Sequence, residues 1–226
     1  MPPGVGQIAG EDAPEPAGHL RRRAATKLLT LPVRLQQGLL NQVGTIDRRL
    51  TVVSLAAGVP LSKLRAGLGP QMRWARAMPS PVCRSGQGLT ALTFARNLSS
   101  TARAEVRNLF AQVGAVLEIP ESRFDAFTVT FSSSHGYHAL AALINAAEAI
   151  GLDRKSARVA AAHALADGIA AGRAGNLPLQ DLLHEAATPG GIAATVMASL
   201  DNAGYPQIIA RALRAGITQA RKNAKS

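Results

Sequence analysis

The stretch Thr188-Pro-Gly-Gly191 places two glycines where a helical segment begins. The first backbone N–H groups of a helix have no partner within it, and the helix dipole favours negative charge there. Because Gly190 and Gly191 carry no side chains, these N–H groups are open to an anion such as a carboxylate. The stretch therefore predicts an anion site. The alternative interpretation is a turn that merely starts a helix.

Hydroxyl and imidazole groups gather at Ser132-Ser-Ser-His135, and His138 follows on the same segment. A zinc site normally has three or four ligands, and no carboxylate stands at matching spacing beside His135 and His138. A nucleophilic serine normally takes its histidine from elsewhere in the fold. We therefore interpret the histidines as structural and expect neither a metal site nor a serine nucleophile.

The single cysteine, Cys83, excludes an internal disulfide and a thiolate metal cluster, which suits a reducing compartment. No apolar run reaches the roughly 18 residues of a membrane helix. The expectation is a soluble, cytoplasmic protein with no membrane partner. Cys83 lies between Arg76 and Arg84, but we expect an inert thiol.

The formal charge of +11 and the pI near 11.1 would suit an anionic partner. However, the basic residues are scattered and aromatics make up only 4% of the chain, whereas nucleic-acid binders concentrate cations beside stacking aromatics. No nucleic-acid partner is expected. The last helical segment carries a polar stripe, interpreted as a solvated face: Arg211, Arg214, Thr218, Arg221, Lys222 and Lys225.

From Leu28 to about Ile119, strand-like and helix-like segments alternate, which predicts a parallel sheet with crossover helices. The expected strands are Thr51–Leu55, Met72–Ala77, Leu89–Phe94 and Ala115–Ile119. The expected helices are Leu35–Val43, Leu61–Leu68 and one that opens at Ser99, buries Val106, Leu109, Phe110 and Val113, and ends at Gly114 in a left-handed cap.

After Pro120 the pattern is helical throughout. Asp153 is expected to cap one helix, which runs toward Gly172, and Pro206 to lie in the first turn of the last. An apolar stripe is expected on the helix before Asp153, formed by Tyr137, Leu140, Leu143, Ile144 and Ala147. We place a domain boundary near Pro120.

Four stretches in a fixed order carry a resemblance to a known family. They are Val52-Val-Ser-Leu-Ala-Ala-Gly-Val-Pro-Leu61, Met78-Pro-Ser-Pro81 with Gly86-Gln-Gly-Leu-Thr-Ala-Leu92, Asp125-Ala126 with Ser132-Ser-Ser-His-Gly-Tyr137, and Thr188-Pro-Gly-Gly191. They resemble the pyrroline-5-carboxylate reductases, which have Met-Pro-Asn-Thr-Pro, Ser-Gly-Ser-Gly-Pro-Ala-Tyr and Ser-Pro-Gly-Gly in the last three places. A weaker match, Leu31-Pro-Val-Arg-Leu-Gln36, resembles the family's Ala-Val-Lys-Pro-Gln turn.

The resemblance implies an α/β fold followed by an all-α part. Residues 1–27 would form a disordered tail, 28–119 a partial Rossmann-like nucleotide-binding domain lacking its first βαβ unit, and 120–226 a helical dimerisation domain. The implied activity is hydride transfer from NADPH or NADH to a small cyclic imine, 1-pyrroline-5-carboxylate, giving proline. The implied assembly is a homodimer through the C-terminal helices, or a higher oligomer, with each site built from both chains.

The matched motifs also imply roles for single residues. The substrate would be bound by Ser133, Thr188, Gly190 and Gly191, and the cofactor by Val33, Arg34, Ala57 and Ser80. In the family, a threonine placed to protonate the reduced nitrogen follows the Pro-Gly-Gly turn, and that position is Ala193 here. Because a methyl group has no proton to give, His135 is a speculative replacement acid.

The expected glycine loop for the pyrophosphate needs a strand before it and a helix after it. The string Gly4-Val-Gly6-Gln-Ile-Ala9 fits the glycine pattern, but only Met1-Pro-Pro3 precedes it and a proline-rich stretch follows. We therefore expect an impaired, N-terminally truncated or degenerate reductase, with nucleotide binding no tighter than millimolar. The alternative is a non-catalytic remnant that still dimerises or serves as a structural or interaction protein.

Overall fold

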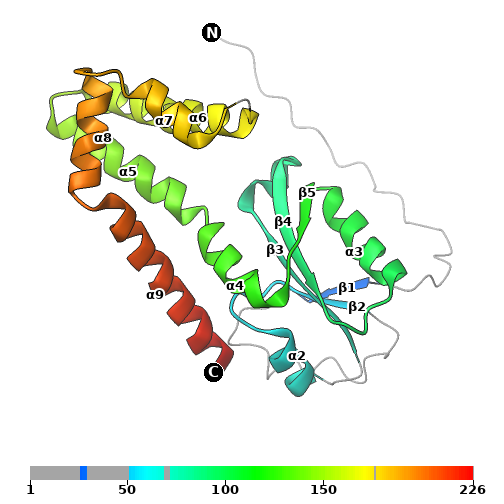
Figure 1. The fold of residues 1–226 in the computed structure, drawn as a ribbon. Helices are drawn as coiled ribbons and strands as arrows, with labels where there is room; N and C mark the ends of the chain where they lie inside the picture. Colours follow the sequence, from blue (N-terminus) through cyan, green and yellow to red (C-terminus); the bar gives the residue numbers. More distant parts are fainter. Residues whose placement is uncertain (1–25, 30–50, 69–71, 176, 226) are drawn as a thin grey trace, which may run out of the picture.

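The structure is a computed structural model that describes residues 26–29, 51–68, 72–175 and 177–225 (Figure 1). A sheet flanked by helices forms one part, and an arm of helices extends from it and returns (Figure 1). The glycine string of residues 4–9, the expected helix Leu35–Val43, and the proposed cofactor residues Val33 and Arg34 lie outside the described residues.

The described strands follow one another across a five-stranded sheet in the order β1-β2-β3-β4-β5. They are β1 (Thr26–Leu29), β2 (Thr51–Ser54), β3 (Arg73–Pro79), β4 (Gly88–Phe94) and β5 (Gly114–Glu118). The four strands expected from residue 51 onward are confirmed to within a residue or two. In addition, β1 includes Thr26 and Lys27, which the sequence had assigned to the tail.

The expectation of an all-parallel sheet is wrong at one pairing. The β1–β2, β2–β3 and β4–β5 pairs are parallel, but β3–β4 is antiparallel. Only the 3-10 helix η2 (Pro81–Ser85) and its short flanks join these two strands. A parallel pair needs a crossover of a dozen or more residues, so a connection this short turns the chain back on itself.

Helices cover both faces of the sheet because side chains alternate along each strand. On one face, Ala75 and Ala77 pack with Val106 and Phe110 of α3 (Ser100–Ala111). On the other face, Trp74 clusters with hydrophobic residues in and around α2 (Leu61–Leu68), which has the predicted bounds. The Ser99 side chain caps α3 by accepting from the Ala102 N–H at 3.2 Å. Of the predicted α3 stripe, Val106 and Phe110 are buried, while Leu109 is 37% exposed.

The sequence predicts that Gly114 caps the end of α3, and this prediction is wrong. Gln112 occupies the C-cap, and Gly114 begins β5 with a φ of 141°. A Cβ at Gly114 would overlap the backbone of Gly88, its partner in the β4–β5 ladder. The glycine is thus needed for the close approach of these two strands.

The second part of the chain is helical, as expected. Its helices are α4 (Glu121–Thr130), α5 (Ser134–Ala149), α6 (Arg154–Ala174), α7 (Leu179–Ala186), α8 (Ile192–Asn202) and α9 (Tyr205–Lys225). Asp153 caps α6 as predicted, and Pro206 lies in the first turn of α9. The six predicted positions of the polar stripe on α9 are all exposed.

The arm leaves the sheet through α4 and α5 and returns through α9, which lies beside α4 (Figure 1). The C-terminal end of α9 reaches the turn after β2. Lys63 Nζ donates to the Asn223 carbonyl at 3.3 Å. Gly58, with a φ of 74°, leaves room for Ala220, whose Cα would lie 2.9 Å from a Cβ at this position. The C-terminus is thereby fixed against the sheet part.

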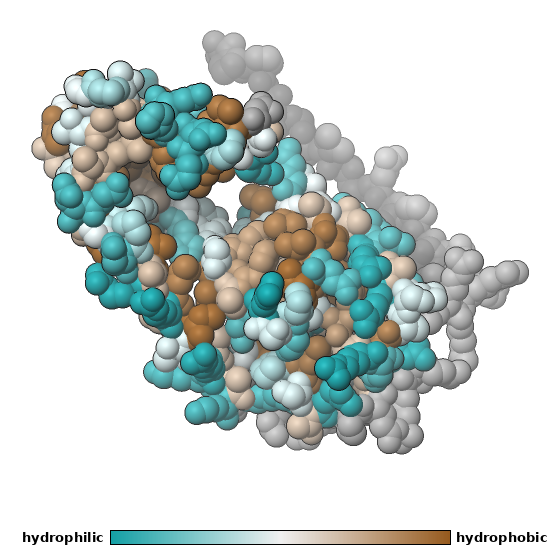
Figure 2. Space-filling view, viewed as in Figure 1, coloured by the Kyte–Doolittle hydropathy of each residue, from teal (hydrophilic) through white to brown (hydrophobic). Residues whose placement is uncertain are grey.

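The helices at the far end of the arm expose much apolar surface. No residue of α5, α7 or α8 is buried within the described chain. On the predicted α5 stripe, Tyr137 is 66% and Leu143 39% exposed. Figure 2 shows hydrophobic residues, in brown, interspersed with polar ones over the visible face of the arm. In the part of the chain that the structure describes, no helix is both long and apolar enough to span a membrane.

Candidate active site

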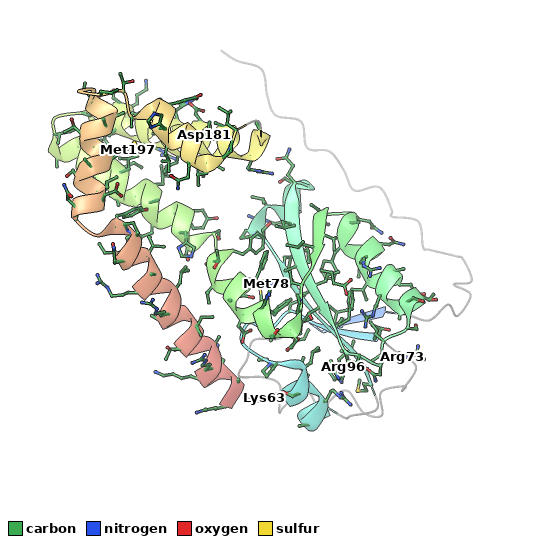
Figure 3. All side chains as sticks on the ribbon, in the orientation of Figure 1. Lys63, Arg73, Met78, Arg96, Asp181 and Met197 are labelled. Carbon is green, nitrogen blue, oxygen red and sulfur yellow. The ribbon has the colours of Figure 1, made fainter. Side chains whose placement is uncertain are left out.

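The cofactor residues implied by the sequence lie at one edge of the sheet. Since β2 and β3 are parallel neighbours, their carboxyl ends meet at the same edge, where ligands bind in open α/β sheets. Ala57 follows β2 on an exposed turn, and Ser80 follows β3 at the start of η2. Figure 3 labels Met78 of β3, two positions before Ser80 in the chain, on the part of the sheet that faces α4.

The hydroxyl of Ser80 is occupied within the β3–β4 connection. Its Oγ accepts from the Leu89 N–H at 3.2 Å, and its own N–H donates to the Leu89 carbonyl at 3.0 Å. The Cys83 thiol lies 3.8 Å from the Ser80 and Thr90 hydroxyls. Ser80 therefore fixes the shape of this loop in addition to any contact with a ligand.

The serine-rich stretch for which the resemblance implies substrate binding forms the turn between α4 and α5, here called the elbow (residues 131–136). Ser133 occupies the N-cap of α5 with right-handed backbone angles, and no described non-glycine residue has a positive φ. Serines at 132 and 134 therefore cause no backbone strain. Their hydroxyls lie 2.7 Å apart, and both side chains are exposed.

His135 has a contact that bears on its speculative acid role. Its Nε2 lies 2.8 Å from the carbonyl oxygen of Val129 near the C-terminal end of α4. A carbonyl can only accept a hydrogen bond, so Nε2 carries the proton in this contact. His135 therefore satisfies one of the carbonyls that the end of α4 leaves without a helical partner.

The Pro-Gly-Gly turn precedes α8 as predicted. Gly191 is the N-cap, and no side chain caps the helix. Gly190 has a φ of 74°, which favours glycine, and a Cβ at Gly191 would lie 2.9 Å from the Thr188 carbonyl oxygen. Ala193 lies in the exposed first turn of α8. The Gly191 N–H donates to the Thr188 carbonyl at 2.8 Å, so the predicted anion site depends on the amides of the first turn of α8 rather than on that glycine. These amides and the helix dipole make this end of α8 suitable for an anion.

The elbow and the α8 N-terminus are not adjacent within one chain. The elbow is where α5 begins beside the sheet, whereas α8 begins near the other end of α5 (Figure 1). An α-helix of 16 residues such as α5 spans roughly 24 Å. One small ligand cannot contact both motifs of the same chain.

Sequence reasoning missed one feature of this region, a buried arginine. The Arg76 side chain is 1% exposed and forms two ion pairs with α4, Nη1 to Glu121 Oε1 and Nη2 to Asp125 Oδ1, each at 2.9 Å. Its guanidinium carbon lies 4.3 Å from the ring centroid of Phe124. An arginine flanked by apolar residues in the middle of a strand was the available signal, because a buried charge requires partners.

A cavity of about 880 Å³ lies at another edge of the sheet part, where β4 and β5 end and α2 and α4 begin. Its lining includes Arg65, Arg96, Arg103 and Glu118. Figure 3 shows Arg96 at this end of the molecule, together with Lys63 and Arg73. None of the site residues implied by the sequence lines this cavity. Among the described residues, no group of three or more His, Cys, Asp or Glu side chains could hold a metal.

Comparison with known proteins identifies the class to which this architecture corresponds. Residues 121–223 match the family model of the pyrroline-5-carboxylate reductase dimerisation domain. The pyrroline-5-carboxylate reductase of Mycobacterium leprae is 30% identical over 183 residues, which cover 73% of this chain and 62% of the relative. That of Thermus thermophilus is 38% identical over 179 residues, which cover 76% and 63%.

A solved structure supports the same assignment at the level of the fold. The chain is similar to Plasmodium falciparum pyrroline carboxylate reductase, solved with NADP bound, with a TM-score of 0.81, 21% identity, and coverage of 87% of this chain and 80% of that one. Together, the match of the helical part to the family model and the matches to the curated relatives support membership of the pyrroline-5-carboxylate reductase family. It spans about three fifths of the length of the two curated relatives.

Proposed function

We propose that the chain is a subunit of a homodimeric reductase that uses NADPH or NADH to convert 1-pyrroline-5-carboxylate to proline. The observation that carries this proposal is the start of α8, where no side chain caps the first turn of an exposed helix N-terminus. A carboxylate is one of the anions that such a terminus binds, and the proposed substrate carries one. The nicotinamide would supply the hydride.

The positions of the two substrate motifs support a dimer. Ser133 is the N-cap of α5, and α8, whose N-cap is Gly191, begins near the other end of α5 (Figure 1). A single small substrate can therefore contact both residues only if they come from different chains. The family's dimerisation domain, matched over residues 121–223, supports oligomerisation. Apolar residues at 192, 196 and 200 follow the i, i+4, i+8 spacing of one α8 face and are 86%, 53% and 46% exposed. A second copy would cover this face.

The cofactor would lie at the edge where Ala57 and Ser80 follow neighbouring parallel strands. The exposed turn at Ala57 offers backbone groups without a bulky side chain, which suits the close approach of a nicotinamide ring. Ser80 would act mainly by holding the β3–β4 loop through its contacts with Leu89.

The test compares two imines in a steady-state assay that follows NADPH consumption. If the α8 N-terminus binds the carboxylate, 1-pyrroline, which lacks that group, should show a KM raised by roughly tenfold or more relative to 1-pyrroline-5-carboxylate, because a charge-assisted contact is lost. Equal KM values for the two imines would exclude carboxylate binding at this helix. No turnover of either imine would contradict the reductase proposal itself.

One observation favours a second candidate, a dimerising protein without catalysis. Ala193 presents a methyl group in the first turn of α8, at the position where the family resemblance implies a proton-donating threonine. The substitution Ala193→Thr separates the two candidates. A reductase that lacks this donor should gain turnover, whereas a non-catalytic protein should remain inactive while its oligomeric state is unchanged.

A further inference from the structure

Arg76 connects three elements through one buried guanidinium. It extends from β3, and its two ion pairs and its contact with Phe124 hold the first turns of α4. Phe124 is 0% exposed, so this contact is fully enclosed. The same Glu121 oxygen that pairs with Arg76 also accepts from the Leu61 N–H at 3.0 Å, at the first residue of α2. The guanidinium therefore fixes α4 directly and α2 through Glu121. Arg76, Glu121, Phe124 and Asp125 are together called the junction.

These three elements lead to the two halves of the proposed site. Arg76 stands two positions before Met78 on β3, and the Ala57 turn leads into α2, so both cofactor-side motifs adjoin the junction. On the other side, α4 ends at the elbow that holds Ser133. The junction thus connects the strand that leads to the cofactor edge with the helix that leads to the substrate elbow of the same chain.

The chemistry of the junction is better suited to fixing the orientation of α4 and α2 than to stabilising the fold. Burying an arginine costs several kcal/mol, which its ion pairs roughly offset, so a buried pair adds little net stability. A planar guanidinium, however, fixes the direction of two carboxylates at once, which a lysine ammonium cannot do. Arg76 Nε and Glu121 Oε2 are also buried and have no hydrogen-bond partner among the described residues. These two atoms carry a desolvation cost that an apolar contact at the same place would not have.

We infer that Arg76 is a positioning residue, which holds the substrate elbow at a fixed place relative to the cofactor edge. The inference rests on the proposed function, because it presumes that the cofactor binds at this edge and the substrate at the elbow. It predicts that loss of the guanidinium fork disturbs α4 and the start of α2 together and leaves α3 unchanged, since α3 packs on the opposite face of the sheet.

Hydrogen exchange tests this inference without any need for turnover. In Arg76→Lys, amide exchange should accelerate by roughly tenfold in 57–61 and 121–131 and should stay within about twofold of wild type in 100–111, because only the junction loses its bidentate contacts. The control is Arg107→Met, which breaks an exposed ion pair with Glu118 and should change none of the three segments. Uniform acceleration, or none, in Arg76→Lys would overturn the inference.

A triple variant separates orientation from stability. Arg76→Met with Glu121→Gln and Asp125→Asn removes every charge of the junction, so its thermal midpoint should stay close to that of wild type. Its kcat should nevertheless fall by roughly tenfold or more, with a smaller change in KM, because the reacting groups are less well aligned. Unchanged kcat in this variant would overturn the inference. Absence of turnover in wild type would count against the proposed function alone, since exchange still decides the role of Arg76.

Discussion

His135 lies where α4 leads into α5, and the sequence indicated it as a speculative proton donor. In the structure its Nε2 donates to the Val129 carbonyl of α4, across the turn that leads into α5. A residue whose proton is used in this way is better suited to holding the elbow than to delivering a proton to a ligand. The same carbonyl could be satisfied by another side chain with a donor of similar reach.

This role predicts different outcomes for two substitutions. His135→Ala should lower the free energy of unfolding by about 1 kcal/mol, because the Val129 carbonyl loses its partner, and His135→Gln should lower it by less, because an amide N–H can replace the imidazole. Urea unfolding measures both, with His138→Ala as the exposed control. A large loss of turnover in His135→Gln at unchanged stability would instead assign His135 to proton transfer.

Residues whose partners lie nearby in the chain could be predicted from sequence, and others could not. The cap at Asp153 and the turn at Gly190 depend on neighbours within a few positions, and the structure has both. The ion pairs of Arg76 join residues 45 and 49 positions apart, so no local pattern contains them. The contact of His135 with Val129 depends on how α4 ends, which sequence does not specify.

At the scale of elements, the helix α6 offers a test of local electrostatics. The Asp153 side chain accepts from the N–H groups of Lys155 and Ser156 at 3.0 and 3.1 Å. The Ser156 side chain, followed by its backbone N–H, lowers the pKa of Asp153 below its ordinary value of 3.8. A carboxylate with a lowered folded pKa stabilises the fold above the unfolded value, and this contribution is lost as pH falls through the folded pKa.

The substitution Asp153→Asn should therefore lower the thermal midpoint near neutral pH, where the aspartate is charged and favoured by the helix dipole. The difference between wild type and Asp153→Asn should shrink as the pH falls below 3.8, in the range set by the lowered pKa. Circular dichroism melts across this range measure it. Glu105→Gln, which removes an exposed carboxylate from α3, is the control and should show no such dependence. A difference that persists in acid would contradict the assignment.

The elements themselves followed from sequence more readily than their arrangement did. Helix α2 and strands β2 to β5 lie where hydrophobic periodicity placed them, because that pattern reflects which side chains each element buries. The direction of β4 depends instead on the length of the connection after β3, which alternation of strands and helices does not reveal. Gly114 was misassigned for a related reason, since the contact that requires it is with Gly88 on another strand.

At the scale of the whole molecule, one chain contains two motifs that it cannot bring together. The elbow adjoins the sheet, and the start of α8 lies near the far end of α5 (Figure 1). The same distal helices leave large apolar side chains in solvent, whereas the sheet part encloses its core between α2 and α3. Burial of the exposed side chains against a second copy would be favourable by about 25 cal/mol per Å² of apolar area removed from water. A second copy of the chain would thus both bring the two motifs together and cover the exposed apolar side chains.

A charge placed on the exposed face of α8 should therefore separate the copies. Val196 is 53% exposed in the middle of that face, and Val82 is 55% exposed on η2 of the sheet part, which makes the two valines a matched pair. Val196→Glu should weaken self-association by at least roughly a hundredfold, because burying an unpaired carboxylate costs several kcal/mol. Val82→Glu should leave association unchanged. Sedimentation velocity over a range of concentrations measures both, and a Val196→Glu protein that sediments like wild type would exclude α8 from the interface. If Val196→Glu becomes monomeric, it should also lose imine reduction, because the elbow and the α8 N-terminus would no longer meet.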